Sequence, residues 1–187
     1  EKFQKINLKS CDQNFLEEVI SSFIYNARTS NQSVELFTYL NGKTDQALLV
    51  KRFTRSEFIA DAILPILTSK EFNDGNNFRS LCNNLINAIS IFDDVPDYLR
   101  SLRQSIFQLA FARKDLHLCL NILKSVNLAR STGDFFEFSS YSTSLIQLVV
   151  DDESIARSLF EYMLNCSTFY YNEPGIAYET WFITCLT

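Results

Sequence analysis

The basic residues of this chain have the types and spacing best suited to binding a partner. They form two groups in the sequence. Lys51, Arg52 and Arg55 crowd one predicted helix junction. A second group lies along or just past one predicted helix and comprises Arg100, Arg103, Arg113 and Lys114. Where helices stack in repeated pairs, equivalent helices line one surface, so these cations are predicted to form a stripe that binds an acidic peptide or RNA. The alternative is a solvated face with ordinary surface ion pairs.

Three phenylalanines form a second candidate for partner binding. Phe135, Phe136 and Phe138 follow the Gly133-Asp134 break, in what the sequence predicts to be a long connection. Exposed aromatic side chains there would anchor a protein partner, because interface hot spots favour such residues. The same side chains could instead fold back and cover the core. Both interpretations stay open at this point.

No group of residues has the spacing that catalysis, metal binding or nucleotide binding requires. His117 is the only histidine, which excludes sites built from two or more histidines. The five cysteines never stand two to four residues apart, and the four glycines are too scattered for a phosphate loop. Carboxylates cluster at positions 93–97 and 151–153, but both clusters precede predicted helices, where they suit caps and the helix dipole. We therefore expect no enzymatic activity, no cofactor and no metal.

Composition limits the classes of partner that the chain is expected to bind and the compartment in which it is expected to lie. The chain has 187 residues and a net charge of −5, which disfavours RNA and anionic lipid as general partners, because both need a positive field. No run of about 18 apolar residues is present, so we expect no membrane span. An odd number of isolated cysteines indicates an intracellular reducing compartment, either cytoplasm or nucleus, with an organelle matrix left open.

The elements that must position these residues are predicted to be helices. Apolar residues recur with helical period in five stripes, at residues 15–27, 58–67, 78–92, 99–110 and 155–164. Shorter helices are predicted at 33–40, 45–53 and 115–126. The stretch 138–150 also fits a helix, although its Ser, Thr and Val residues would suit a strand.

Local signals fix several expected helix ends. Asp12 and Asp152 are placed to cap the helices that follow them. Thr54 and Glu57 have the spacing of a capping box, in which each side chain satisfies a backbone N–H of the other residue. Pro65 lies inside its stripe, where it should kink the helix or end it early.

The spacing of the helices predicts how they pack. Helix starts in the middle of the chain fall about twenty residues apart, hence about forty per pair, which is the period of stacked helix-pair repeats. We expect an all-α fold of stacked antiparallel helix pairs, either an α-solenoid or an irregular helical-repeat bundle, with about nine or ten helices. No Pro/Gly/Ser-rich linker divides the chain, so residues 1–187 are predicted to form a single helical domain. The lack of an initiator Met and the apolar ending at 181–186 predict that this domain comes from a longer protein.

One segment resembles a known repeat. Between Tyr141 and Met163 the chain is similar to one pentatricopeptide repeat, and the likeness rests on Tyr141, Leu145, Ile146, Ala156, Leu159, Phe160 and Met163. A tetratricopeptide-type repeat fits nearly as well. The resemblance implies a helical-repeat protein and, for the pentatricopeptide family, RNA binding.

Together these patterns predict a non-enzymatic helical-repeat module that binds another protein within a larger protein or complex. The alternative function is an RNA-binding, pentatricopeptide-like domain. Basic charge along one groove would favour RNA, whereas a mixed or apolar groove would favour a protein.

Overall fold

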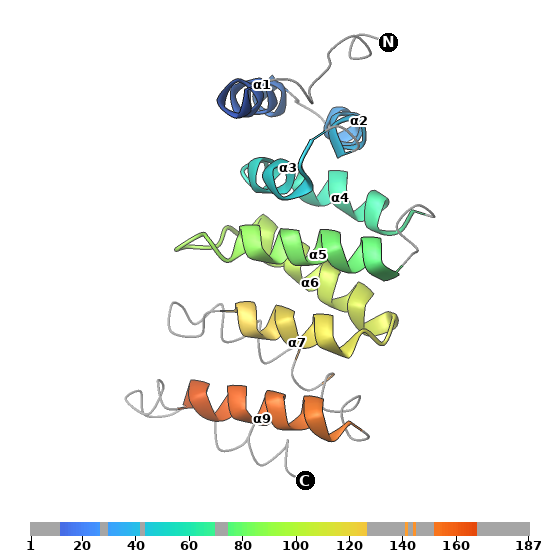
Figure 1. Cartoon of the computed structure of the whole chain (residues 1–187), viewed down its shortest axis with the longest axis vertical. Coiled ribbons are helices and arrows are strands. Elements are labelled where there is room, and N and C mark those ends of the chain that lie inside the picture. The colour runs from blue at the N-terminus through green and yellow to red at the C-terminus, as the bar shows by residue number, and fades with distance from the viewer. Residues whose placement is uncertain are drawn as a thin grey trace. The chain divides into compact units, whose positions relative to one another are not determined.

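The computed structural model describes residues 12–26, 30–41, 44–69, 75–126, 141, 144 and 152–167. Regular structure in these ranges is entirely helical, so the predicted all-α class is confirmed (Figure 1). The described helices are α1 (Gln13–Asn26), α2 (Ser30–Asn41), α3 (Gln46–Phe53), α4 (Ile59–Leu67), α5 (Gly75–Ile89), α6 (Asp97–Ala112), α7 (Leu116–Ser125) and α9 (Glu153–Ser167). The predicted total of nine or ten helices stays a prediction, as does most of the helix expected at 138–150, which lies outside the described ranges.

The chain divides into two compact units, Glu1–Ser105 and Ile106–Thr187. The division falls inside α6 and not at a linker. The first unit holds α1 to α5 and the first half of α6, and the second holds the rest of α6, α7 and α9. The prediction of one domain over 1–187 is not tested by this division.

Helices two apart in the sequence pack against each other in the first unit. α3 packs against both α1 and α5, and α2 packs against α4 (Figure 1). Smaller contacts join α2 to α1 and α3. Phe37 of α2 and Phe53 of α3 meet edge to face, with ring centroids 5.1 Å apart, a favoured geometry for an aromatic pair in a core.

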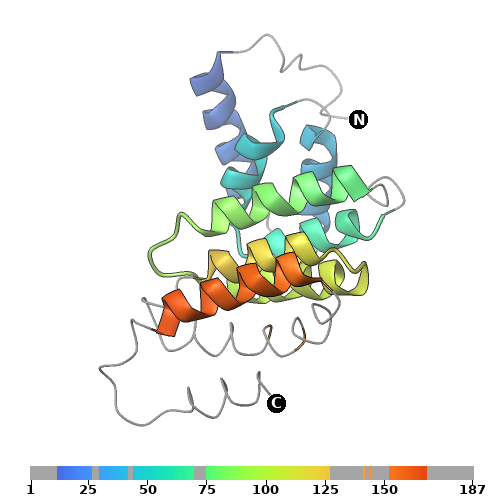
Figure 2. The same cartoon turned by 60° about the horizontal axis from the view of Figure 1, so that its bottom comes forward.

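Two described helices pack against each other in the second unit. α7 packs against α9, and the two helices lie side by side in both views (Figures 1 and 2). The hydroxyl of Tyr162 in α9 donates to the carbonyl of Val126, just after α7, at 3.0 Å. Phe107 of α6 stacks on Tyr141 with centroids 4.5 Å apart. Tyr141, one of the residues that carry the pentatricopeptide resemblance, is therefore a core residue.

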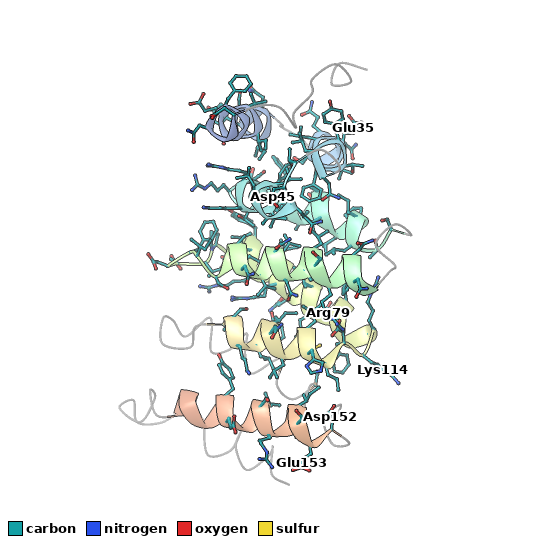
Figure 3. The ribbon with its side chains drawn as sticks, viewed as in Figure 1. Glu35, Asp45, Arg79, Lys114, Asp152 and Glu153 are labelled. Carbon is teal, nitrogen blue, oxygen red and sulfur yellow. The ribbon has the colours of Figure 1, made fainter. Side chains whose placement is uncertain are left out.

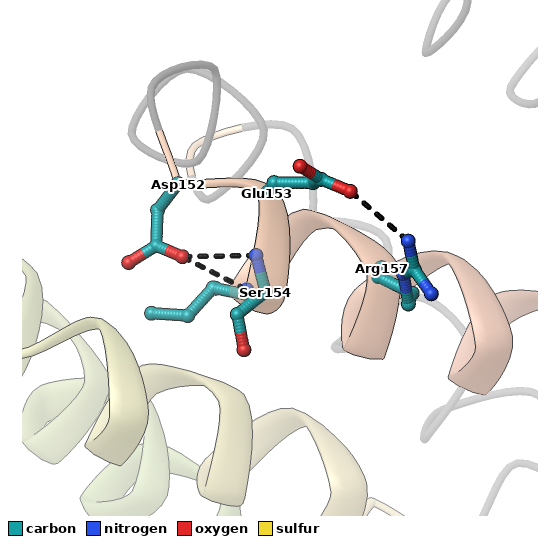
Figure 4. Close-up of polar contacts among 5 residues, drawn as sticks. Asp152, Glu153, Ser154 and Arg157 are labelled. Atoms are coloured by element: carbon teal, nitrogen blue, oxygen red, sulfur yellow. Dashed lines mark hydrogen bonds and ion pairs between the residues drawn. The ribbon is translucent and has the colours of Figure 1, made fainter.

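Aspartates cap the helices where the sequence predicted caps. The carboxylate of Asp12 accepts from the backbone N–H groups of Asn14 and Phe15. Asp152 accepts from the N–H groups of Ser154 and Ile155, both at 3.1 Å, and Glu153 pairs with Arg157 at 3.0 Å one turn later (Figure 4). These bonds satisfy N–H groups that have no partner inside the helix.

The predicted capping box at Thr54 and Glu57 is wrong. Thr54 ends α3, and its hydroxyl donates to the carbonyl of Lys51 at 2.9 Å. α4 begins at Ile59, and its N-cap Phe58 makes no side-chain capping bond. The spacing alone could not show that Thr54 would satisfy the carbonyls of the preceding helix. Pro65 lies inside α4, which continues to Leu67, the last residue of the predicted stripe. Pro65 therefore does not end the helix early.

Candidate partner-binding surface

The first basic group lies where α3 ends. Lys51 and Arg52 belong to the last turn of α3, and Arg55 follows in the turn before α4. Lys51 and Arg55 are exposed, whereas Arg52 is half-buried. Cations at this end of a helix meet the negative end of its dipole, which gives Lys51 and Arg52 a structural reason to be there. The exposed ends of Lys51 and Arg55 are the parts of this group open to a partner.

A tertiary hydrogen bond brings the start of α6 to the same place. The hydroxyl of Tyr98 donates to the backbone carbonyl of Thr54 at 3.0 Å. Arg100 lies two residues beyond Tyr98 and belongs to the first turn of α6. The structure therefore places the start of α6 beside the turn that follows Lys51 and Arg52 and contains Arg55. We call this region, with Arg100 in the first turn of α6, the α3–α6 basic surface. In the sequence these residues form two separate groups.

Carboxylates lie among these cations. Arg100 pairs with Asp94 at 3.6 Å, and the side chain of Asp94 is 99% exposed against 21% for Arg100. Burial raises the pKa of the Tyr98 phenol, and the nearby charge of Glu57 raises it further. A neighbouring carboxylate disfavours phenolate because two negative charges repel. The α3–α6 basic surface thus carries charges of both signs.

The structure corrects the role predicted for Arg103. Only 1% of Arg103 is exposed, so it does not lie on a partner-binding surface. Its spacing from the buried Leu99, Ile106 and Ala110 is four, three and seven residues, which puts all four on one helix face. A buried guanidinium persists only where polar partners surround it, so Arg103 has a structural role. The same spacing in the sequence could have revealed its burial.

Arg113 and Lys114 stand at the turn from α6 to α7, in the second unit. Arg113 is half-buried, whereas Lys114 is exposed and points away from the helices (Figure 3). The N–H of Lys114 donates to the carbonyl of Phe111, and that of Asp115 to Ala110. This is the bond pattern of a Schellman motif, with Lys114 at the left-handed position (φ 57°) that usually holds glycine. Arg113 and Lys114 belong to a different unit from Arg100. The basic stripe predicted to contain all three therefore stays a prediction.

The predicted aromatic site at Phe135, Phe136 and Phe138 lies outside the described residues and stays a prediction. Among the described residues, the large apolar side chains that are exposed are Phe15 and Tyr25 of α1 and Ile91, in the turn after α5. Phe15 was predicted to lie on the apolar stripe of α1, yet 54% of it is exposed.

Groups able to bind a metal ion are not brought together in the described ranges. No three His, Cys, Asp or Glu residues there stand close enough to hold a metal ion. His117 is exposed on α7. Cys82 and Cys119 are buried free thiols. Burial, helped by the charge of Asp115, raises the pKa of Cys119 to about 12, which makes that thiol a poor nucleophile because the thiolate is the reactive form.

A network of amide side chains between α3 and α5 was not predicted from the sequence. The side-chain oxygen of Gln46 accepts hydrogen bonds from the amide of Asn84 at 3.0 Å and the hydroxyl of Ser80 at 3.4 Å. The amide nitrogen of Gln46 donates to Asn41 at 3.2 Å. The available signal was composition, because α5 holds five asparagines in fifteen residues, and asparagine is a poor helix former.

The described helices define an all-α protein with a mixed-charge surface where α3 meets α6. None of these helices has the length and apolar character needed to cross a bilayer. Comparison with protein-family models, with curated proteins and with solved structures finds no match to this chain.

Proposed function

We propose that this chain is a non-enzymatic helical-repeat module that binds another protein through the α3–α6 basic surface. The observation that carries the repeat architecture is the pairing of alternate helices. α3 contacts α1 and α5, α2 contacts α4, and α7 contacts α9. In a stack of helix pairs, each helix packs on the equivalent helix of the next pair, which is two positions along the chain.

The charges of the surface favour a protein over RNA. Lys51 and Arg55 present exposed cations, while Asp94 and Glu57 lie among the same residues. A protein interface pairs charges of both signs. A nucleic-acid surface needs a dominant positive field, because affinity comes largely from phosphate neutralisation. The net charge of −5 weakens such a field further.

A charge-reversal experiment tests the proposal. The double variant Lys51→Glu, Arg55→Glu should lose its partner in affinity capture while keeping its helical circular dichroism spectrum. The loss should be the same with and without nuclease. Lys124→Glu is the matched control, because Lys124 is exposed on α7 in the other unit. Capture that survives in the double variant would contradict the proposed surface.

A salt titration decides between protein and RNA. We expect no detectable binding of mixed single-stranded RNA at ~150 mM salt. A dissociation constant of about 1 µM or tighter under these conditions, weakening steeply with salt and lost in the double variant, would replace the protein-binding proposal with the RNA-binding one.

A further inference from the structure

Asn41 and Gly42 form the one Asn-Gly pair in the sequence. The backbone nitrogen that follows an asparagine can attack its side-chain amide, and it does so most readily in glycine, which has no Cβ to obstruct the nitrogen. Asn41 is the last residue of α2 and is half-buried. The pair is therefore a candidate for spontaneous deamidation, a covalent modification that needs only water.

Deamidation proceeds through a five-membered ring. The backbone nitrogen of Gly42 gives its proton to a solvent base and attacks Cγ of Asn41, so that an N–Cγ bond forms. The Cγ–Nδ2 bond then breaks, and the side-chain amide group leaves as ammonia with a proton taken from water. Water opens the resulting succinimide at one of its two C–N bonds. The product at position 41 is aspartate or isoaspartate, and no oxidant or reductant is consumed.

The conformation of Asn41 in the folded chain opposes ring closure. Asn41 lies in α2, and a helical ψ of about −40° does not bring the following nitrogen onto Cγ. Its side-chain oxygen also accepts a hydrogen bond from the amide nitrogen of Gln46 at 3.2 Å. To close the ring, Asn41 must leave the helical conformation and turn its side chain away from Gln46. The attack is therefore slow while this hydrogen bond holds.

Gln46 is itself held by α5. Its side-chain oxygen accepts hydrogen bonds from the amide of Asn84 at 3.0 Å and from the hydroxyl of Ser80 at 3.4 Å. Because an amide has its oxygen and nitrogen on opposite sides, these two donors turn the nitrogen of Gln46 toward Asn41. Gln46 begins α3, which packs against α5. The hydrogen bonds thus link the reactivity of Asn41 to the packing of α3 on α5.

We propose that Asn41 is a deamidation site that the hydrogen bond from Gln46 keeps closed in the folded chain and that opens when α3 moves away from α5. The inference is independent of the proposed function, because it needs no partner. Deamidation replaces a neutral amide by a carboxylate, and isoaspartate also lengthens the backbone between α2 and α3. A chain that has opened at this point therefore carries a permanent covalent mark of the event.

The full chain is incubated at neutral pH, and modification of Asn41 is followed by peptide mass spectrometry, with release of ammonia as a second readout. The key variant is Gln46→Ala, which removes the donor to Asn41 and leaves a good helix former in α3. Gln104→Ala makes the same chemical change at an exposed position of α6. Asn84→Ala removes one of the hydrogen bonds that hold Gln46 and so tests the link to α5.

A further variant separates local release of Asn41 from general loss of stability. Leu120→Ala empties a buried site in α7 and should lower the stability of the chain without touching the network. Circular dichroism establishes the conditions under which every variant is folded. Each chain is also incubated in urea, where the reaction proceeds without the fold.

We expect Gln46→Ala to deamidate at Asn41 about tenfold faster than the wild-type chain, as the loss of one hydrogen bond implies. Asn84→Ala should accelerate the reaction by a smaller factor. Gln104→Ala and Leu120→Ala should react at the wild-type rate while folded. In urea all chains should react at one rate, which should exceed that of the folded wild-type chain.

Three results would overturn the inference. The first is a rate in Gln46→Ala that is equal to or lower than the wild-type rate. The second is an acceleration in Leu120→Ala as large as that in Gln46→Ala, because release of Asn41 would then follow general unfolding. The third is absence of the modification at Asn41 in urea, which would remove the site itself.

Discussion

Lys114 holds a left-handed backbone conformation that residues with a side chain rarely adopt. Its φ of 57° closes the turn after α6 and delivers Asp115 to cap α7, where the carboxylate accepts from the N–H of Leu118. Arg103 is a second residue whose position is unusual for its type, because its cationic side chain is buried on a helix face with apolar residues. At both positions the surrounding fold decides the conformation or burial against the usual preference of the residue.

Lys114→Gly should raise the free energy of unfolding by about 1 kcal/mol, because glycine adopts positive φ without the steric penalty of a Cβ. Urea denaturation measures the change. Gln104→Gly is the control, since Gln104 is exposed in the middle of α6 and the substitution there should lower stability by about 1 kcal/mol. A loss of stability in Lys114→Gly would mean that the left-handed turn is not present in solution.

Arg103→Ala should lower the free energy of unfolding by about 2–4 kcal/mol, because it empties a buried site and leaves polar partners unsatisfied. Arg55→Ala, at an exposed position, should change stability by less than about 0.5 kcal/mol. Thermal and urea unfolding measure both variants. If Arg103→Ala and Arg55→Ala change the free energy of unfolding equally, the burial of Arg103 is contradicted.

The Cys119 thiol should resist alkylation by iodoacetamide at pH 8 in the native chain and react after unfolding. Its pKa is raised to about 12 from an ordinary value of 9.0, so almost no thiolate forms when the chain is folded. The raised pKa also means that the protonated thiol stabilises the fold below pH 9 and that this contribution is lost as the pH rises toward 12. Peptide mass spectrometry resolves Cys119 from the other cysteines, and rapid native labelling of Cys119 would contradict its burial.

At the scale of the elements, most helices could be predicted from the sequence because apolar stripes with helical period survive in any tertiary context. The apolar positions of α5 are buried as the stripe predicts, and so are those of α7 except the half-buried Leu116 at its start. Helix ends were harder to predict, because capping residues between two helices can serve either one. Thr54 satisfies α3, and Asp45 caps the start of that helix by accepting from the N–H of Ala47.

Two variants test which residues cap the helices of the α3–α4 region. Asp45→Ala tests the cap of α3, and Glu57→Ala tests the capping box predicted ahead of α4. Asp45→Ala should lower the free energy of unfolding by about 1 kcal/mol, because it leaves an N–H of α3 unsatisfied. Glu57→Ala should have an effect below about 0.5 kcal/mol, since no capping box forms. A larger loss of stability for Glu57→Ala than for Asp45→Ala in thermal unfolding would support the capping box instead.

At the scale of the whole chain, the candidate surface was only partly predictable. The basic residues are visible in the sequence, but the approach of α6 to α3 depends on the Tyr98 hydrogen bond to a backbone carbonyl, which no local pattern encodes. The second basic group is divided because Arg103 is buried, which its spacing from Leu99 and Ile106 indicates, and because Arg113 and Lys114 belong to the other unit. The asparagines of α5 could have been noticed from composition, whereas the hydrogen bond of Asn84 to Gln46 required the packing of α3 on α5.

The central architectural claim of the proposal is that helices stack pair by pair, and deleting residues 1–43 tests it most directly. This deletion removes α1 and α2, whose main contacts are with α3 and α4. A stack with nearest-neighbour contacts should survive the loss of a terminal pair. We expect residues 44–187 to keep an unchanged helical circular dichroism signal per residue and to unfold cooperatively at a lower urea concentration. Loss of helical signal and of cooperative unfolding across the remaining chain would contradict the stacked-pair account.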